Sequence, residues 1–175
     1  MEIKRIFLVG FMGSGKSTLG KRLKTEMDWE FIDLDDYFEE RFHTTIKEYF
    51  SDEGETAFRR AEQQMLLEVM NKERLIIATG GGTPCYFDNM ELMNANGLSI
   101  YIKLPVDTLV GRLSGPKQLR PLVSGKSGEE LTLFISQKLA EREPYYSKAK
   151  IIADGDVLGV DGFLRIIEAS GQLMK

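Results

Sequence analysis

Residues 10–17 read Gly-Phe-Met-Gly-Ser-Gly-Lys-Ser, which matches the pattern G-x-x-x-x-G-K-[ST] at every fixed position. An apolar run rich in β-branched residues, 3–9, precedes this stretch and predicts a buried strand. A helix is predicted to follow over 16–27, because Leu19 and Leu23 lie four residues apart. A strand, a glycine-rich loop and a helix N-terminus together form a cradle of backbone N–H groups for an anion. The stretch therefore predicts a nucleoside triphosphate site in an α/β protein.

The motif also assigns roles to its polar residues. Lys16 is expected to reach the β- and γ-phosphates, and the Ser17 hydroxyl is expected to bind Mg²⁺. A chance glycine turn before a helix is the alternative, and the agreement of all fixed residues with the strand–helix context argues against it. The predicted nucleotide contacts come from Gly13, Ser14, Gly15, Lys16, Ser17 and Thr18.

Composition limits the possible classes of protein. A length of 175 residues predicts a single domain, and a net charge of −4 argues against a general nucleic-acid binder. The single cysteine, Cys85, excludes an internal disulfide and is typical of a reducing cytoplasm. No signal peptide or apolar run of membrane-spanning length is apparent. We therefore expect a cytoplasmic protein.

Short apolar runs alternate with helical patterns along the chain. Strands are predicted over 3–9, 29–33, 75–79, 98–104 and 149–153. Helices are predicted over 16–27, 34–42, 45–52, 54–71, 88–96, 106–114, 128–148 and 157–172. This alternation is typical of βαβ units, so we expect a parallel sheet covered on both faces, with ligands beyond the carboxyl ends of its strands.

The segment 114–128 is rich in glycine, proline and basic residues and shows neither helical nor strand periodicity. A long irregular loop within a compact domain is usually functional or disordered. Beside a phosphate site, it predicts a lid that closes over the nucleotide, from which Arg120 could reach the transferring phosphates. A solvated linker is the alternative.

Two acids follow the second predicted strand. Of Asp33 and Asp35, one could hold Mg²⁺ through water, and the other could orient an acceptor hydroxyl and take its proton. Alternatively, both acids cap the helix predicted over 34–42.

Two arginines and a glycine triplet are further candidates. Arg59 lies three residues before Glu62, which favours an ion pair on the helix surface, although Arg59 could instead bind a carboxylate while Glu62 orients it. Arg142 on its own indicates only a solvated or ion-paired residue. The glycines at 80–82 favour close approach of the backbone to a ligand over a strained turn. His43 and Cys85 are interpreted as structural.

Taken together, these motifs resemble those of the shikimate kinase family. The resemblance rests on residues 10–18 with their Phe-Met pair, Asp33-Leu34-Asp35, Phe58-Arg59-Arg60-Ala61-Glu62, Gly80-Gly81-Gly82, Arg120-Pro121-Leu122 and Arg142-x-x-Tyr145. It implies an α/β three-layer sandwich with a five-stranded parallel sheet, the P-loop kinase fold with a mobile lid. One kinase domain would cover 1–175, with the lid at about 114–128 and a shikimate-binding helical region at about 34–62.

The resemblance also implies a reaction and the residues that perform it. ATP, with Mg²⁺ as cofactor, would phosphorylate the 3-hydroxyl of shikimate in aromatic amino-acid (chorismate) biosynthesis. The implied catalytic residues are Lys16, Asp35 and Arg120, and Arg120 would also contact ATP. Ser17 would bind the metal directly and Asp33 through water. Shikimate would be bound by Asp35, Arg59, Gly81 and Arg142. Expected partners are ATP and shikimate, with no nucleic acid and no membrane, and a monomer is expected.

Two features leave alternatives open. Relatives often carry an arginine near adenine where this chain has Leu113, and the adjacent Arg112 is a substitute. A kinase for another small acid, such as gluconate, would share Lys16 and the lid but would not need Arg59 and Arg142 in this arrangement. A regulatory nucleotide-binding protein would have no use for an acceptor site.

Overall fold

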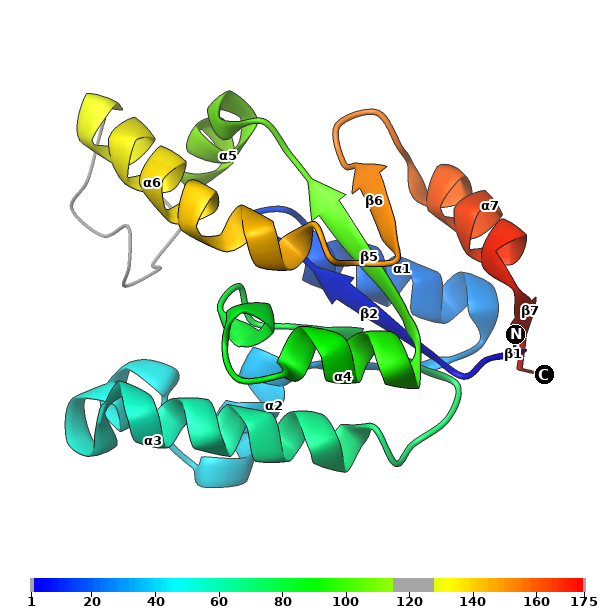
Figure 1. The fold of residues 1–175 in the computed structure, drawn as a ribbon, viewed down its shortest axis with the longest axis horizontal. Helices are drawn as coiled ribbons and strands as arrows, with labels where there is room; N and C mark the ends of the chain where they lie inside the picture. The colour runs from blue at the N-terminus through cyan, green and yellow to red at the C-terminus, as the bar shows by residue number, and fades with distance from the viewer. Residues whose placement is uncertain (1, 115–127, 175) are drawn as a thin grey trace.

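The computed structural model describes residues 2–114 and 128–174, which form a three-layer α/β structure (Figure 1). Its central sheet has five parallel strands in the order β3-β4-β2-β5-β6, which confirms the predicted sheet. The strands of this sheet are β2 (Arg5–Val9), β3 (Glu30–Asp33), β4 (Leu75–Ala78), β5 (Leu98–Lys103) and β6 (Ile151–Asp154).

Helices connect these strands and cover the sheet. They are α1 (Lys16–Met27), α2 (Leu34–Phe42), α3 (Ile46–Val69), α4 (Asn89–Asn96), α5 (Val106–Leu113), α6 (Gly128–Tyr146) and α7 (Val160–Ser170), with a short 3₁₀ helix, η1 (Thr83–Cys85). Within the described ranges, no helix combines the length and apolar character needed to cross a membrane.

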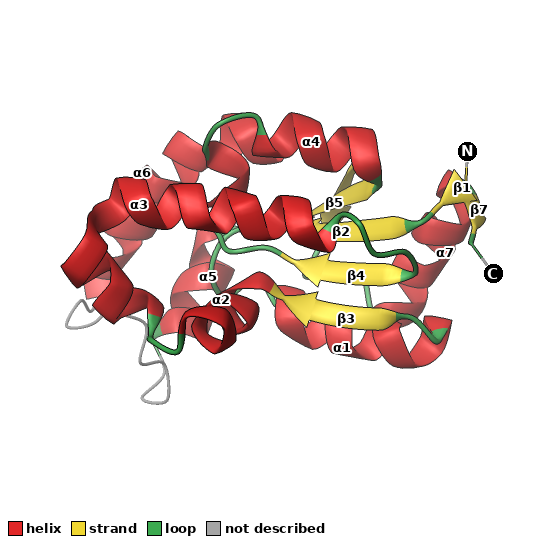
Figure 2. Ribbon diagram, turned by 90° about the horizontal axis from the view of Figure 1, so that it is seen from below, coloured by secondary structure: helices red, strands yellow, loops and turns green. Residues whose placement is uncertain are grey.

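Side chains of the central strands alternate between two hydrophobic clusters. In β2, Phe7 and Val9 pack with residues of α3, α4 and α6, whereas Ile6 and Leu8 pack with residues of α1 and α7. Figure 2 shows α3 and α4 along one face of the sheet. Because both faces are covered, all four residues of β4 are buried, which explains the continuous apolar run of that strand.

The two ends of the chain pair with each other, which the sequence did not predict. The predicted strand 3–9 is divided, and its first part, β1 (Glu2–Ile3), pairs in parallel with β7 (Gln172–Leu173). Figure 1 shows both termini at this pair. The predicted helix over 157–172 ends earlier, at Ser170, because the following residues enter β7. A pair of two-residue strands is too short to leave a recognisable pattern in the sequence.

The two helices predicted over 45–52 and 54–71 form one element, α3, with a kink between them. Gly54 at the kink has φ 82°, a conformation that other residues rarely adopt. Thr45 caps the first turn, and Glu48 completes a capping box with it. The predicted break is therefore present as a change of direction within α3.

Gly20 of α1 is expected to be essential for packing against β3. An added Cβ would lie 2.2 Å from Cε2 of Phe31, so we expect Gly20→Ala to destabilise the fold by about 1–3 kcal/mol. Gly111 of α5 has nothing within 4 Å of such an atom, so Gly111→Ala should stabilise it by about 0.5–1 kcal/mol. Thermal unfolding of both variants tests this, and an equal rise in Tm would contradict the packing argument.

Candidate active site

The loop between β2 and α1 has the backbone conformation of an anion cradle. Gly10, Gly13 and Gly15 have φ values of 147°, 79° and 92°, which other residues rarely adopt. Gly15 is also the N-cap of α1, so the loop leads directly into the positive end of a helix dipole. The motif glycines at positions 10 and 15 are therefore required by backbone geometry.

Two polar side chains are buried within this loop. The Nζ atom of Lys16 donates to the carbonyl oxygens of Gly10 (2.9 Å) and Phe11 (3.0 Å), which lays the ammonium group across the loop. The Ser14 hydroxyl is buried without a hydrogen-bond partner in the described part of the chain. Such a group is costly unless a ligand satisfies it, so the loop fits a polyphosphate.

Asp33 joins the phosphate loop to the start of α2. Its Oδ2 accepts a hydrogen bond from the Ser17 hydroxyl, and its Oδ1 accepts one from the backbone N–H of Asp35 at 3.1 Å. The carboxylate therefore caps α2 and also faces Ser17, so the two interpretations of this acid are compatible. Adjacent hydroxyl and carboxylate oxygens fit a hard cation such as Mg²⁺, which keeps most of its water ligands.

The glycine triplet after β4 brings together three predicted site residues from three helices. Cβ atoms added at positions 80, 81 and 82 would lie 2.8, 3.1 and 2.6 Å from side-chain atoms of Asp35, Arg142 and Arg59, respectively. Contacts below 3.0 Å are essentially never seen for real Cβ atoms, so a side chain at position 80 or 82 would displace the Asp35 carboxylate or the Arg59 guanidinium. These glycines thus allow an acid and two arginines to converge beside the phosphate loop.

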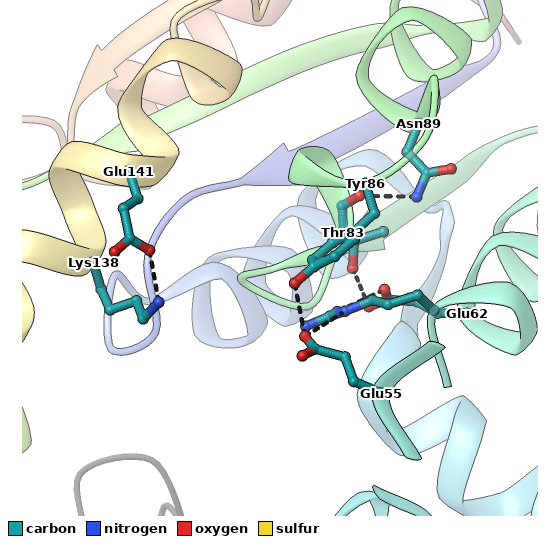
Figure 3. A network of polar contacts seen from close by, with 8 residues as sticks. Glu55, Glu62, Thr83, Tyr86, Asn89, Lys138 and Glu141 are labelled. Atoms are coloured by element: carbon teal, nitrogen blue, oxygen red, sulfur yellow. Dashed lines mark hydrogen bonds and ion pairs between the residues drawn. The ribbon is translucent and has the colours of Figure 1, made fainter. Parts of the chain in front are cut away.

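Arg59 is a buried cation rather than part of a surface ion pair. Its Nη1 donates to Glu62 at 2.8 Å, and Glu62 also accepts a hydrogen bond from the Thr83 hydroxyl at 2.5 Å (Figure 3). Burial is the largest single effect and opposes the charge of Arg59, but Glu62, Tyr86 and Glu55 together outweigh it and raise the pKa of Arg59. The guanidinium is therefore fixed and charged beside the glycine turn.

Arg142 lies on α6, on the other side of the same turn. Its guanidinium carbon is 5.6 Å from the centre of the Phe11 ring, so the side chain also borders the phosphate loop. The Tyr146 hydroxyl, one turn further along α6, donates to the carbonyl oxygen of Gly81 at 2.5 Å. Arg142 and Tyr146 therefore both connect α6 to the glycine turn.

Sequence reasoning singled out Tyr145 in the arginine motif, yet Tyr146 is the buried tyrosine that contacts the turn. Burial raises the pKa of Tyr146, so its hydroxyl stays protonated and able to donate at neutral pH. Its spacing from buried Ile135, about three helical turns, was the signal that could have identified it. The helix continues through Pro144 to Tyr146, in agreement with the helix predicted over 128–148.

Arg112 of α5 contacts the outer side of the phosphate loop. Its Nη1 donates to the carbonyl oxygens of Gly13 (3.3 Å) and Ser14 (3.4 Å), and its Nη2 is 3.6 Å from Asp156. Asp156 also accepts a hydrogen bond from the Thr108 hydroxyl at 2.7 Å. The sequence-based substitute for an arginine near adenine therefore lies against the loop and the segment after β6.

Three further candidate residues are Arg120, His43 and Cys85. Arg120 and most of the predicted lid, 115–127, lie outside the described residues. His43 forms the C-cap of α2 with φ 53°. Cys85 ends η1 and is partly buried. The structural interpretation of His43 and Cys85 stays a prediction.

Comparison with family models and with known proteins identifies the shikimate kinase family. The family model described as "Shikimate kinase" matches residues 12–161. The shikimate kinase of Parabacteroides distasonis is 47% identical to the chain over 173 residues, which cover 99% of each protein.

Solved structures agree with this match. The crystal structure of shikimate kinase from Bacteroides thetaiotaomicron has a TM-score of 0.90 at 44% identity and covers 96% of this chain and 98% of its own. Shikimate kinase from Acinetobacter baumannii, solved in complex with shikimate, has a TM-score of 0.85 at 30% identity, with 96% and 94% covered. Similarity therefore extends over nearly the whole chain.

Cys85 is expected to react slowly with thiol reagents in the native chain. Burial raises the pKa of its thiol to about 11, so little thiolate is present at pH 8. Unfolding in guanidinium should accelerate its reaction with Ellman's reagent about 100-fold at that pH, because the thiol returns to its ordinary pKa. The native rate should rise about tenfold per pH unit up to pH 10. Equal rates for native and unfolded chain at pH 8 would contradict the burial of this thiol.

Proposed function

The chain belongs to the shikimate kinase family, and we propose that it transfers the γ-phosphate of ATP to the 3-hydroxyl of shikimate, in the chorismate pathway to aromatic amino acids. The observation that carries the proposal is the convergence of Asp35, Arg59 and Arg142 on the glycine turn beside the phosphate loop. This arrangement supplies one acid for a hydroxyl and two cations for a carboxylate. A nucleotide-binding module without an acceptor would need none of them.

The phosphate loop is proposed to bind ATP. Backbone N–H groups of residues 13–18 surround the phosphates, and Lys16 moves from its loop carbonyls onto the β- and γ-phosphates. The unpartnered Ser14 hydroxyl supports this assignment. Mg²⁺ would be held by Ser17 directly and by Asp33 through water, and it would neutralise charge on the phosphates.

The acceptor is proposed to bind on the other side of the glycine turn. Arg59 and Arg142 bind the carboxylate of shikimate, and the backbone N–H of Gly81 donates a further hydrogen bond. The oxygen of the 3-hydroxyl attacks the γ-phosphorus while Asp35 accepts the hydroxyl proton, and ADP leaves. The hydrogen bond from Tyr146 to the carbonyl oxygen of Gly81 supports the proposed role of Gly81, because it holds the glycine turn in one position.

Further parts of the proposal come from the sequence. Arg120 is proposed to stabilise the transferring phosphoryl group from the lid at about 114–128, which would exclude water as a competing acceptor. The helical region at about 34–62 is proposed to bind shikimate within one domain over 1–175. A monomer in the cytoplasm is proposed, with no nucleic-acid or membrane partner.

The acceptor can be tested directly with the purified full-length chain. ATP consumption with Mg²⁺ should rise strongly on addition of shikimate and should stay at the background rate with gluconate or nucleoside monophosphates. Omission of Mg²⁺ in the presence of EDTA should abolish the shikimate-dependent rate. Turnover with gluconate but not with shikimate would overturn the proposed acceptor.

Arg59 and its neighbour Arg60 form a matched pair for the carboxylate site. Arg59→Ala should raise the KM for shikimate at least about 100-fold and leave the KM for ATP within about twofold, because a buried charge-assisted contact is lost. Arg60→Ala should change neither, since Arg60 is exposed.

Removal of Arg59 also leaves Glu62 buried and unpaired, which could destabilise the chain. Arg59→Lys keeps the charge and should still weaken shikimate binding, because an ammonium group cannot form the two-pronged contact. Tm measurements would separate loss of fold from loss of binding. A parallel loss of ATP and shikimate binding in Arg59→Lys would argue against the assigned role.

A further inference from the structure

Tyr86, which follows η1, contacts the guanidinium of Arg59 with its ring. Its ring centre lies 4.1 Å from the guanidinium carbon, closer than the rings of Phe58 (5.0 Å) and Phe50 (5.8 Å). Its hydroxyl donates to Oε1 of Glu55 at 2.7 Å. Figure 3 shows Tyr86 and Thr83 extending from the segment after β4 toward the glutamates of α3.

Glu55 completes a triangle with these two residues. The Oε1 atom that accepts from Tyr86 is also 3.5 Å from Nε of Arg59. The hydrogen bond from Tyr86 lowers the pKa of Glu55, and burial followed by this same bond raises the pKa of Tyr86. At neutral pH the hydroxyl is therefore protonated and the carboxylate ionised, which is the combination that this hydrogen bond requires.

These contacts hold Arg59 from a second direction. Glu62, itself held by Thr83, fixes the Nη1 end of the guanidinium, while Tyr86 covers one face and Glu55 lies at the Nε edge. The buried Nε has no hydrogen-bond partner within the described residues, so the ring contact and the ion pair replace a direct hydrogen bond at that edge. Without Tyr86, Glu55 would lose the group that orients it.

We propose that Tyr86 is a positioning residue for the acceptor site. Its ring contacts the guanidinium of Arg59 directly, and its hydroxyl orients Glu55, which pairs with Arg59. The inference rests on the proposed role of Arg59 in binding the shikimate carboxylate. An arginine side chain has many rotamers, and a planar two-pronged contact needs one orientation. Because the guanidinium of Arg59 is already ordered in the folded chain, binding of the acceptor does not have to order it.

The test compares Tyr86→Phe, Tyr86→Ala and Glu55→Gln in the full-length chain. Tyr86→Phe keeps the ring and loses the hydroxyl, so the KM for shikimate should rise about threefold, whereas Tyr86→Ala should raise it about tenfold. Glu55→Gln keeps an acceptor for the Tyr86 hydroxyl and loses the charge that pairs with Arg59, so it should raise the KM for shikimate about as much as Tyr86→Phe does. The KM for ATP should stay within about twofold in all three.

Glu68→Gln is the matched control for Glu55→Gln. Glu68 of α3 lies outside the helical region at about 34–62 and accepts a hydrogen bond from the Tyr37 hydroxyl at 2.8 Å, so this pair repeats the tyrosine–glutamate contact without touching Arg59. Glu68→Gln should leave the KM for shikimate within about twofold. An equal effect of Glu68→Gln and Glu55→Gln would show general stabilisation of α3 and would overturn the inference.

The double variant Arg59→Ala/Tyr86→Ala separates this inference from the proposed function. If Tyr86 acts through Arg59, the double variant should have the same KM for shikimate as Arg59→Ala, within about twofold. An unchanged KM in Tyr86→Ala beside a strong effect of Arg59→Ala would overturn the inference alone. An unchanged KM in Arg59→Ala would overturn the carboxylate role of Arg59 and this inference with it.

Discussion

The arrangement of the site depends on a turn with no side chains, at residues 80–82. Cβ atoms at the first and last of these positions would come within 3.0 Å of charged groups of Asp35 and Arg59, and one at the second would be 3.1 Å from Arg142. These groups come from α2, α3 and α6, and α6 is far from the other two helices in the sequence. Because the turn occupies so little space, three helices can bring their charged groups to one place.

Of the three converging groups Arg59 is buried, and burial of a charge is costly unless partners compensate it. The charge of Arg59 is compensated by the carboxylate of Glu62, which in turn accepts a hydrogen bond from the Thr83 hydroxyl. Asp33 is used in the same way, because one carboxylate satisfies both the N-terminus of α2 and Ser17. Arg59, Glu62 and Asp33 are therefore ordered when the chain folds, before a ligand binds.

Local signals in the sequence predicted much of this structure. The phosphate loop, the buried strand at 75–78 and the break at Gly54 each depend on a few neighbouring residues, so pattern and residue type were sufficient. The contacts of Thr83, Tyr86 and Tyr146 depend instead on how η1 packs against α3 and α6. Helical spacing from Ile135 could have identified Tyr146 as buried, but no periodicity encodes which groups these three residues contact. The sequence thus indicated the residues that carry charge and left most of those that hold them in place unassigned.

The pairing of the strands explains why donor and acceptor sites lie next to each other. Parallel register aligns Leu8 of β2 with Ala78 of β4, and Ala78 with Asp33 of β3. The backbone N–H and the hydroxyl of Thr79 both donate to the carbonyl oxygen of Leu8, which fixes this register where the strands end. The phosphate loop, the glycine turn and the acid pair therefore leave the sheet at the same level. A slip of one residue between β2 and β4 would move the glycine turn relative to the phosphate loop and would exchange the two buried faces of β4, so the packing of the core and the geometry of the site are fixed by the same hydrogen bonds.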